Sequence, residues 1–219
     1  MALRAVIFDM DGVVVDSEPR HERAIQEVVR DLGYGELGLR FADYIGRADN
    51  ELWVDFVAKR KPAQSVRELM ALKRRRVVEI LRREQPFFDG LLALVARLAG
   101  RYLLALASGS ERGVVEEVLK LGGLGRFFSA VVSGSDVARG KPAPDIFLRA
   151  AELLGVAPGD CCVIEDSKPG VSAGVAAGMT VIAITNTHPA EELRQATHVV
   201  RNYEEIEGLL MTRQEQGPS

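Results

Sequence analysis

Short apolar runs that alternate with helical stretches are the feature that most restricts the fold of this chain. From Tyr102 onward, most of these runs are apolar on both faces. Strands of a parallel sheet have this composition because helices bury them from both sides. The pattern therefore predicts an α/β fold built on a parallel sheet. The predicted strands are residues 5–8, 102–107, 130–132, 161–164, 180–184 and 198–200.

A long helical insert separates the first predicted strand from the second. Residues 15–85 show no convincing strand, and their apolar residues recur at helical spacing after Ser17, near Leu52 and after Ser65. An insert of about 70 residues is much longer than an ordinary crossover, so it should form its own small domain. We predict a Rossmann-like core from residues 1–14 and 86–219, and an all-helical cap domain from residues 15–85.

Composition and charge disfavour several broad classes of protein. With 219 residues, 47% of them hydrophobic, the chain is long enough for one α/β domain with an insert. Its net charge of −3 argues against a general nucleic-acid binder, which carries a basic excess. No apolar run reaches membrane-spanning length, and the N-terminus leads directly into a strand. We expect a soluble, cytoplasmic monomer with no nucleic-acid or membrane partner.

The two cysteines, Cys161 and Cys162, are adjacent in the sequence. Neighbouring residues of a strand point to opposite faces of the sheet, so we expect no disulfide between them. The favoured interpretation is a pair of small core residues in a protein of a reducing compartment.

Two carboxylates follow the first predicted strand. Asp9 and Asp11 are two residues apart, so they leave the strand on the same side. In an open parallel sheet the ligand crevice lies beyond the carboxyl ends of the strands, which places both acids at its floor. Close carboxylates repel each other unless a cation neutralises them or one of them holds a proton. An acidic turn is the alternative interpretation of this pair taken alone.

Three other predicted strands are followed by residues that suit a phosphate or a metal ion. Ser108 and Gly109 precede a helix, and the first N–H groups of a helix attract anions. Lys141 follows the third strand and supplies a compact positive charge. Glu165 and Asp166 follow the fourth strand and offer the oxygen ligands that magnesium prefers. A helix cap or an exposed lysine would explain each residue alone, but their occurrence at one edge of the sheet favours a shared site.

The motifs at these four strand ends can be compared with those of known families. They are Asp9-Met10-Asp11-Gly12-Val13, Ser108-Gly109-Ser110, Gly140-Lys141-Pro142 and Ile164-Glu165-Asp166-Ser167. Together they resemble the haloacid dehalogenase superfamily, and residues 141–147 are similar to its β-phosphoglucomutase and sugar-phosphate phosphatase branch. The resemblance covers nearly the whole chain, including the helical cap. It implies a strand order of 5-4-1-2-3, with Asp9 and Asp166 on adjacent central strands.

The resemblance also implies a role for each of these residues. Asp9 would be the nucleophile that forms an aspartyl-phosphate, and Asp11 would protonate the leaving oxygen and then activate water. Magnesium would be held by Asp9, the backbone carbonyl of Asp11 and Asp166, with Glu165 as a direct or outer ligand. The groups implied to bind phosphoryl oxygens are Ser108, the Gly109 backbone and Lys141.

Residues of the cap and of its surroundings are implied to contact the substrate. Glu18 and His21 lie in a segment similar to the cap entrance of the family. In the mutases, a histidine at the position of His21 helps to couple cap closure to acid–base chemistry, and an exposed helix residue is the alternative. Gly46 and Arg47 lie in a loop similar to a substrate-reading loop. Arg112 follows the second motif, where the mutases have an asparagine.

The destination of the phosphoryl group separates a phosphatase from a mutase of the same branch. A mutase holds a bisphosphate and needs a second, cationic phosphate site, because burying a second dianion without paired charge is costly. At the two positions that the mutases use, this chain has Asp49 and Glu111, although Arg47 and Arg112 lie beside them. The sequence therefore favours a Mg²⁺-dependent phosphatase of a small phosphorylated metabolite, with a β-phosphoglucomutase-type mutase as the alternative.

Two other activities on the same fold are disfavoured. A 2-haloacid dehalogenase needs neither a metal nor a second acid, so Asp11, Glu165 and Asp166 would be unexplained in it. A catalytically inactive binding protein would not need a competent residue at every catalytic position. We therefore expect a phosphoric monoester hydrolase whose partner is a small phosphorylated molecule, such as a sugar phosphate.

Overall fold

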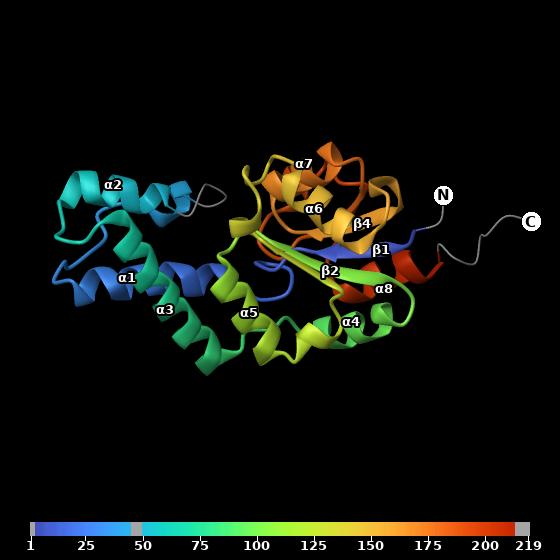
Figure 1. Ribbon diagram of the computed structural model, residues 1–219, viewed down its shortest axis with the longest axis horizontal. Coiled ribbons are helices and arrows are strands. Elements are labelled where there is room, and N and C mark those ends of the chain that lie inside the picture. The colour runs from blue at the N-terminus through green and yellow to red at the C-terminus, as the bar shows by residue number, and fades with distance from the viewer. Residues whose placement is uncertain (1–2, 45–49, 213–219) are drawn as a thin grey trace, which may run out of the picture. The chain divides into compact units, whose positions relative to one another are not determined.

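A computed structural model describes residues 3–44 and 50–212 of the chain. The contacts divide the chain into two compact units (Figure 1). The first unit combines Met1–Val15 with Phe87–Ser219, and the second unit is Asp16–Pro86. The chain therefore leaves the first unit shortly after its first strand and returns to it 71 residues later, since the second unit covers residues 16–86.

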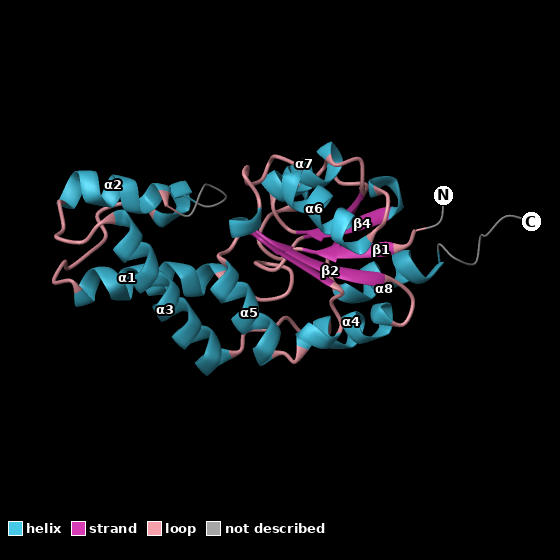
Figure 2. Cartoon of the chain, in the orientation of Figure 1, coloured by secondary structure: helices cyan, strands magenta, loops and turns pink. Residues whose placement is uncertain are grey.

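A six-stranded parallel sheet is the centre of the first unit (Figure 2). Its strand order, β3-β2-β1-β4-β5-β6, reads 6-5-4-1-2-3 from the other edge. It thus contains the order expected from the sequence, with β6 added beside β5. The strands are β1 (Ala5–Phe8), β2 (Leu103–Ser108), β3 (Ala130–Ser133), β4 (Cys161–Glu165), β5 (Thr180–Ile184) and β6 (His198–Val200).

Helices cover both faces of the sheet, as its apolar strands require. The helices α6 and α7 lie on one face, and α4, α5 and α8 lie on the other (Figure 1). Alternate strand residues such as Ala5 and Ile7 join the core cluster that contains the buried residues of α6 and α7. The helices are α4 (Leu91–Ala99), α5 (Arg112–Leu121), α6 (Asp145–Leu154), α7 (Lys168–Ala176) and α8 (Tyr203–Thr212). Single turns of 3-10 helix are η2 (Leu124–Arg126), η3 (Gly134–Asp136), η4 (Pro158–Asp160) and η5 (Ala190–Glu192).

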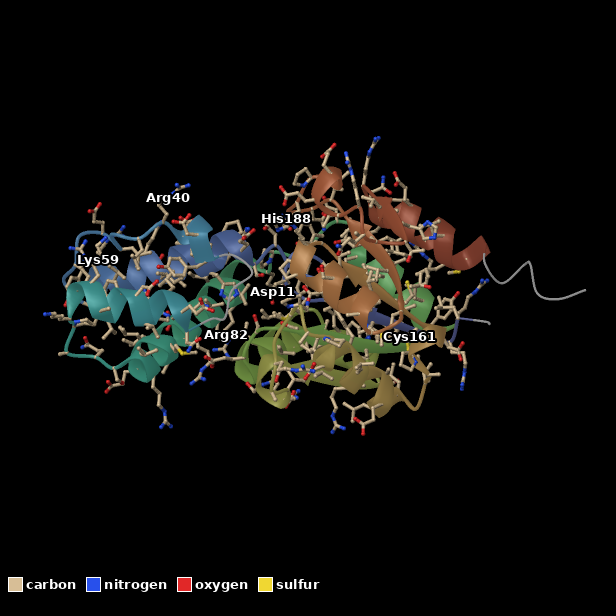
Figure 3. The ribbon with its side chains drawn as sticks, turned by 90° about the horizontal axis from the view of Figure 1, so that it is seen from above. Asp11, Arg40, Lys59, Arg82, Cys161 and His188 are labelled. Carbon is tan, nitrogen blue, oxygen red and sulfur yellow. The ribbon has the colours of Figure 1, made fainter. Side chains whose placement is uncertain are left out.

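The two ends of the sheet differ in chemical character. All six strands run in the same direction, so their carboxyl ends share one edge. Figure 3 shows Asp11 and His188 at this end and Cys161, the first residue of β4, at the other. Cys161 and Cys162 are both buried and neither forms a disulfide, as the sequence predicts. The side chains that are candidates for chemistry therefore gather at the carboxyl edge.

The second unit is helical. No strand occurs in its described residues, 16–44 and 50–86. Its core includes Trp53 and Phe56, both fully buried, and Arg76 links two helices through Glu27 at 2.8 Å and Asp31 at 2.6 Å. Its elements are α1 (Glu18–Asp31), η1 (Phe41–Tyr44), α2 (Glu51–Arg60) and α3 (Val66–Glu84). Among the described residues of either unit, none of the helices is long and apolar enough to cross a membrane.

Candidate active site

The turn after β1 holds the first acid of the site in a buried position. The N–H of Asp9 donates to the carbonyl of Ile164 in β4 at 3.0 Å, so the sheet pairing continues one residue past the strand. The Asp9 side chain is buried. Gly12 has a φ of +83°, and a Cβ on this residue would collide with the carboxylate of Asp166. The turn therefore needs glycine both for its backbone conformation and for space.

Lys141 bridges two buried carboxylates. Its Nζ lies 2.5 Å from Asp9 Oδ1 and 2.5 Å from Glu165 Oε1. Burial is the largest influence on Asp9 and raises its pKa to about 8, although the Lys141 ammonium opposes this shift. Burial also opposes the charge on Lys141, but the two carboxylates outweigh it and raise the pKa of Lys141 above its ordinary value. The lysine is therefore a permanent positive charge in the site.

The other oxygen of Glu165 is fixed by the chain that follows it. Oε2 accepts hydrogen bonds from the N–H of Asp166 at 2.8 Å, the N–H of Ser167 at 2.8 Å and the Ser167 hydroxyl at 2.9 Å. The Ser167 hydroxyl also caps α7 by accepting from the N–H of Gly170. A Cβ on Gly170 would overlap the Glu165 carboxylate. Ser167 therefore caps α7 and also fixes Glu165, so this motif provides both a helix cap and a buried acid.

Asp9, Glu165 and Asp166 form one acidic cluster. One carboxylate oxygen from each lies within 4.8 Å of the others. Burial, together with the charges of Glu165 and Asp9, raises the pKa of Asp166 well above its ordinary value. The Oδ2 of Asp166 accepts a hydrogen bond from the Thr187 hydroxyl, whereas its buried Oδ1 has no hydrogen-bond partner among the described residues. A buried oxygen without a donor, in an all-oxygen cluster of negative charge, fits a hard divalent cation such as Mg²⁺.

Asp11 contacts the hydroxyl groups at the end of β2. Its Oδ2 accepts from Ser108 Oγ and from Ser110 Oγ, each at 2.9 Å. The Ser108 oxygen also accepts from the N–H of Ser110 at 3.0 Å. Gly109 lies between the two serines, and Gly134 passes so close to its carbonyl that a Cβ there would collide with it. The acid and the predicted phosphate-binding loop are therefore parts of one hydrogen-bonded network.

Arg112 is held by the end of β3. It is the first residue of α5, and Glu111 occupies the N-cap position of this helix. The Arg112 guanidinium pairs with Asp136. Asp136 also accepts from the N–H of Ser133 at 2.7 Å and from its hydroxyl at 2.8 Å. Although burial opposes the charge, these hydrogen bonds and Arg112 lower the pKa of Asp136. The predicted substrate residue Arg112 thus takes part in a structural ion pair.

The remaining predicted substrate residues lie outside the first unit. Glu18 and His21 are on α1 of the second unit, where Glu18 is the first helical residue. Gly46 and Arg47 lie outside the described residues. Their contacts with a substrate therefore stay predictions from the sequence.

Two residues after β5 contact the site but were not identified from the sequence. Thr187 donates to Asp166, and the Asn186 amide donates to the carbonyl of Gly12 at 2.8 Å. The available signal was the polar run 185–187 directly after an apolar strand, which places these residues at the same sheet edge as the acids. Hydroxyl and amide groups are common in ordinary loops, so this signal is weaker than paired carboxylates.

Comparison with known proteins identifies the class to which this fold and site belong. The family model described as haloacid dehalogenase-like hydrolase matches residues 3–178. The chain belongs to the haloacid dehalogenase-like hydrolases. The resemblance expected from the four sequence motifs is thereby confirmed.

The chain is also similar to individual proteins of known sequence or structure. The fructose-1-phosphate phosphatase YqaB of Escherichia coli (strain K12) is 34% identical over 188 residues, which cover 82% of this chain and 95% of that protein. A match of 35% identity covers 88% of this chain but only 19% of Protein SUPPRESSOR OF QUENCHING 1, chloroplastic, of Arabidopsis thaliana, which is much longer. The crystal structure of CbbY from Rhodobacter sphaeroides in complex with phosphate is 26% identical, with a TM-score of 0.83 over 93% of this chain and 96% of that chain.

Proposed function

We propose that this chain is a Mg²⁺-dependent phosphatase that hydrolyses a small phosphate monoester, such as a sugar phosphate, through a phosphorylated Asp9. The observation that carries the proposal is the buried cluster of Asp9, Glu165 and Asp166, with Lys141 bridging two of its members. Three carboxylates and one lysine leave an excess of negative charge that a divalent cation would balance. The similarity to a fructose-1-phosphate phosphatase over most of its length supports the class of substrate.

The first half of the reaction transfers the phosphoryl group to the protein. An oxygen of Asp9 would form a bond to phosphorus while the bond from phosphorus to the ester oxygen breaks. Protonated Asp11 would donate its proton to the leaving oxygen, so that an alcohol departs. Lys141, already 2.5 Å from Asp9 Oδ1, supplies positive charge beside the reacting oxygen. Bound Mg²⁺, held by Asp9, Asp166 and the Asp11 carbonyl, would neutralise further negative charge on the phosphoryl group.

The second half returns the phosphoryl group to water. Asp11, now a carboxylate, would accept a proton from water while the water oxygen attacks phosphorus. The acyl-phosphate bond breaks, inorganic phosphate leaves and the Asp9 carboxylate is restored. The hydroxyls of Ser108 and Ser110 fix Asp11 Oδ2, so the orientation of the acid does not depend on the substrate.

The surroundings of Arg112 favour hydrolysis over the mutase reaction. Arg112 is one of the arginines that could compensate for the acidic residues at a second phosphate site. Its guanidinium is paired with Asp136 instead, and the acidic residue Glu111 is the N-cap directly before it. Withdrawing Arg112 from its ion pair would leave Asp136 without that charge partner, which adds to the cost of binding a second phosphate.

A panel of phosphomonoesters tests the proposal. We expect phosphate release from several esters in the presence of Mg²⁺, complete loss of turnover with a chelator, and recovery when Mg²⁺ is restored. The panel should include β-glucose 1-phosphate with a trace of glucose 1,6-bisphosphate. Formation of glucose 6-phosphate much faster than free phosphate would establish the mutase instead. Full turnover in the chelator would contradict the proposed metal site.

Replacing Thr187 by valine should weaken Mg²⁺ binding. The substitution keeps the shape of the side chain but removes the hydroxyl that donates to Asp166. Outer hydrogen bonds that orient a metal ligand typically change affinity by about 10–100-fold, so the Mg²⁺ concentration for half-maximal turnover should rise by about that factor. Thr185→Val is the matched control, since the Thr185 hydroxyl bonds to the carbonyl of Val200. Equal Mg²⁺ requirements in the two variants would contradict the role given to Thr187.

A further inference from the structure

Two side chains far apart in the sequence hold the turn that follows β1. The amide of Asn186 donates to the carbonyl of Gly12 at 2.8 Å and to the hydroxyl of Tyr203 at 3.1 Å. The Tyr203 hydroxyl donates in turn to the carbonyl of Val13 at 2.6 Å. We call the pair Asn186 and Tyr203 the clasp. It uses both N–H groups of the amide and the single O–H of the phenol.

The donor and acceptor roles in these hydrogen bonds fix the orientation of both clasp side chains. A carbonyl only accepts hydrogen bonds, so the Tyr203 hydroxyl must point at Val13 and the Asn186 amide nitrogen must point at Gly12. Burial raises the pKa of Tyr203, so the phenol keeps its proton and remains a donor. Tyr203 is 6% exposed and its ring lies against Phe88, with 6.3 Å between ring centroids. The buried and packed ring therefore holds the Tyr203 hydroxyl in place.

The turn held by the clasp contains residues of the proposed active site. Gly12 directly follows Asp11, the proposed acid and base, and a Cβ on Gly12 would overlap the carboxylate of Asp166. The backbone hydrogen bonding that pairs β1 with β4 ends at Asp9. Beyond it, the turn closes on itself through the N–H groups of Gly12 and Val15. Displacing the two carbonyls would move the backbone of Asp11, including the carbonyl proposed to bind the metal.

We infer that Asn186 and Tyr203 are positioning residues that set the backbone of Asp11 by fixing the carbonyls of Gly12 and Val13. The role in catalysis rests on the proposed phosphatase function. Both residues act through the turn, since these hydrogen bonds go to its carbonyls and to each other. Misplacement of a catalytic group by about 1 Å can cost up to about 100-fold in rate, so a loss of one clasp hydrogen bond should reduce turnover without removing it.

The test compares Tyr203→Phe with Tyr102→Phe. Tyr102 is a matched control because its hydroxyl also donates to a backbone carbonyl at 2.6 Å, that of Leu210, in the same unit. We expect Tyr203→Phe to lower kcat by about tenfold, with KM changed by less than about twofold, while Tyr102→Phe leaves both within about twofold. Thermal unfolding of both variants measures the loss of stability that the two substitutions share.

Amide hydrogen exchange measures the effect of the clasp on the turn. It needs no substrate, so its result does not depend on the outcome of the phosphomonoester panel. The N–H groups of Gly12, Val14 and Val15 are hydrogen-bonded within the turn, and we expect them to exchange about tenfold faster in Tyr203→Phe but not in Tyr102→Phe. If Tyr203→Phe does not fold, Asn186→Ala, at a half-buried position, should give the same two effects. Unchanged exchange, or faster exchange with unchanged kcat in an active enzyme, would overturn the inference.

Discussion

Replacing Asp9 by asparagine should lower kcat/KM by at least about 10⁴-fold, because an amide does not form the acyl-phosphate bond. The change is nearly isosteric, so the fold should be retained. Burial already disfavours the charge on Asp9 and raises its pKa to about 8. A neutral side chain at this position removes that desolvation cost, although Lys141 loses one of its two carboxylate partners.

Two measurements make this prediction specific. Turnover of Asp9→Asn should be compared with that of Asp89→Asn, since Asp89 is an exposed residue of the same unit and should tolerate the change. Rapid quenching with a radiolabelled phosphate ester should trap label on the wild-type protein and none on Asp9→Asn. Wild-type turnover in the variant, or equal labelling of both proteins, would show that the phosphoryl group does not pass through Asp9.

Replacing Gly170 by alanine should weaken Mg²⁺ binding by about 10–100-fold, although helix propensity alone would favour the change by about 1 kcal/mol. The new Cβ would overlap the Glu165 carboxylate. This carboxylate has no simple way to retreat, because three donors fix one oxygen and Lys141 fixes the other. The steric conflict therefore outweighs propensity and displaces a member of the acidic cluster.

Gly174→Ala is the matched control for this prediction. It lies in the same helix, and its Cβ would be 2.7 Å from Val181 Cγ2, away from the carboxylates. Overpacking of this kind costs about 1–3 kcal/mol of stability, so the melting temperature should fall while the Mg²⁺ requirement stays the same. Mg²⁺ titrations of turnover and thermal unfolding of both variants separate the two effects. An unchanged Mg²⁺ requirement in Gly170→Ala would contradict the placement of Glu165 in the metal site.

Sequence patterns were sufficient for the sheet because its strands are defined locally. Each strand is a short apolar run, and its burial between helices follows from that composition alone. The run 161–164 was one residue short of β4, which ends at Glu165. The sequence places Glu165 directly after the strand because the apolar run ends at Ile164. In the structure Glu165 is fully buried, since Lys141 and three donors compensate its charge.

The sequence by itself determined the strands, their helical insert and the acids and lysine at the carboxyl edge, because short windows of residues encode burial and turns. Only the tertiary structure decided which of these groups meet. Lys141 lies 132 positions from Asp9, and Tyr203 lies 190 positions from Val13. Arg112 and Asp136 become partners only when α5 packs beside β3. Such contacts depend on how distant segments pack against each other, and the pattern within a short stretch of sequence does not specify this packing.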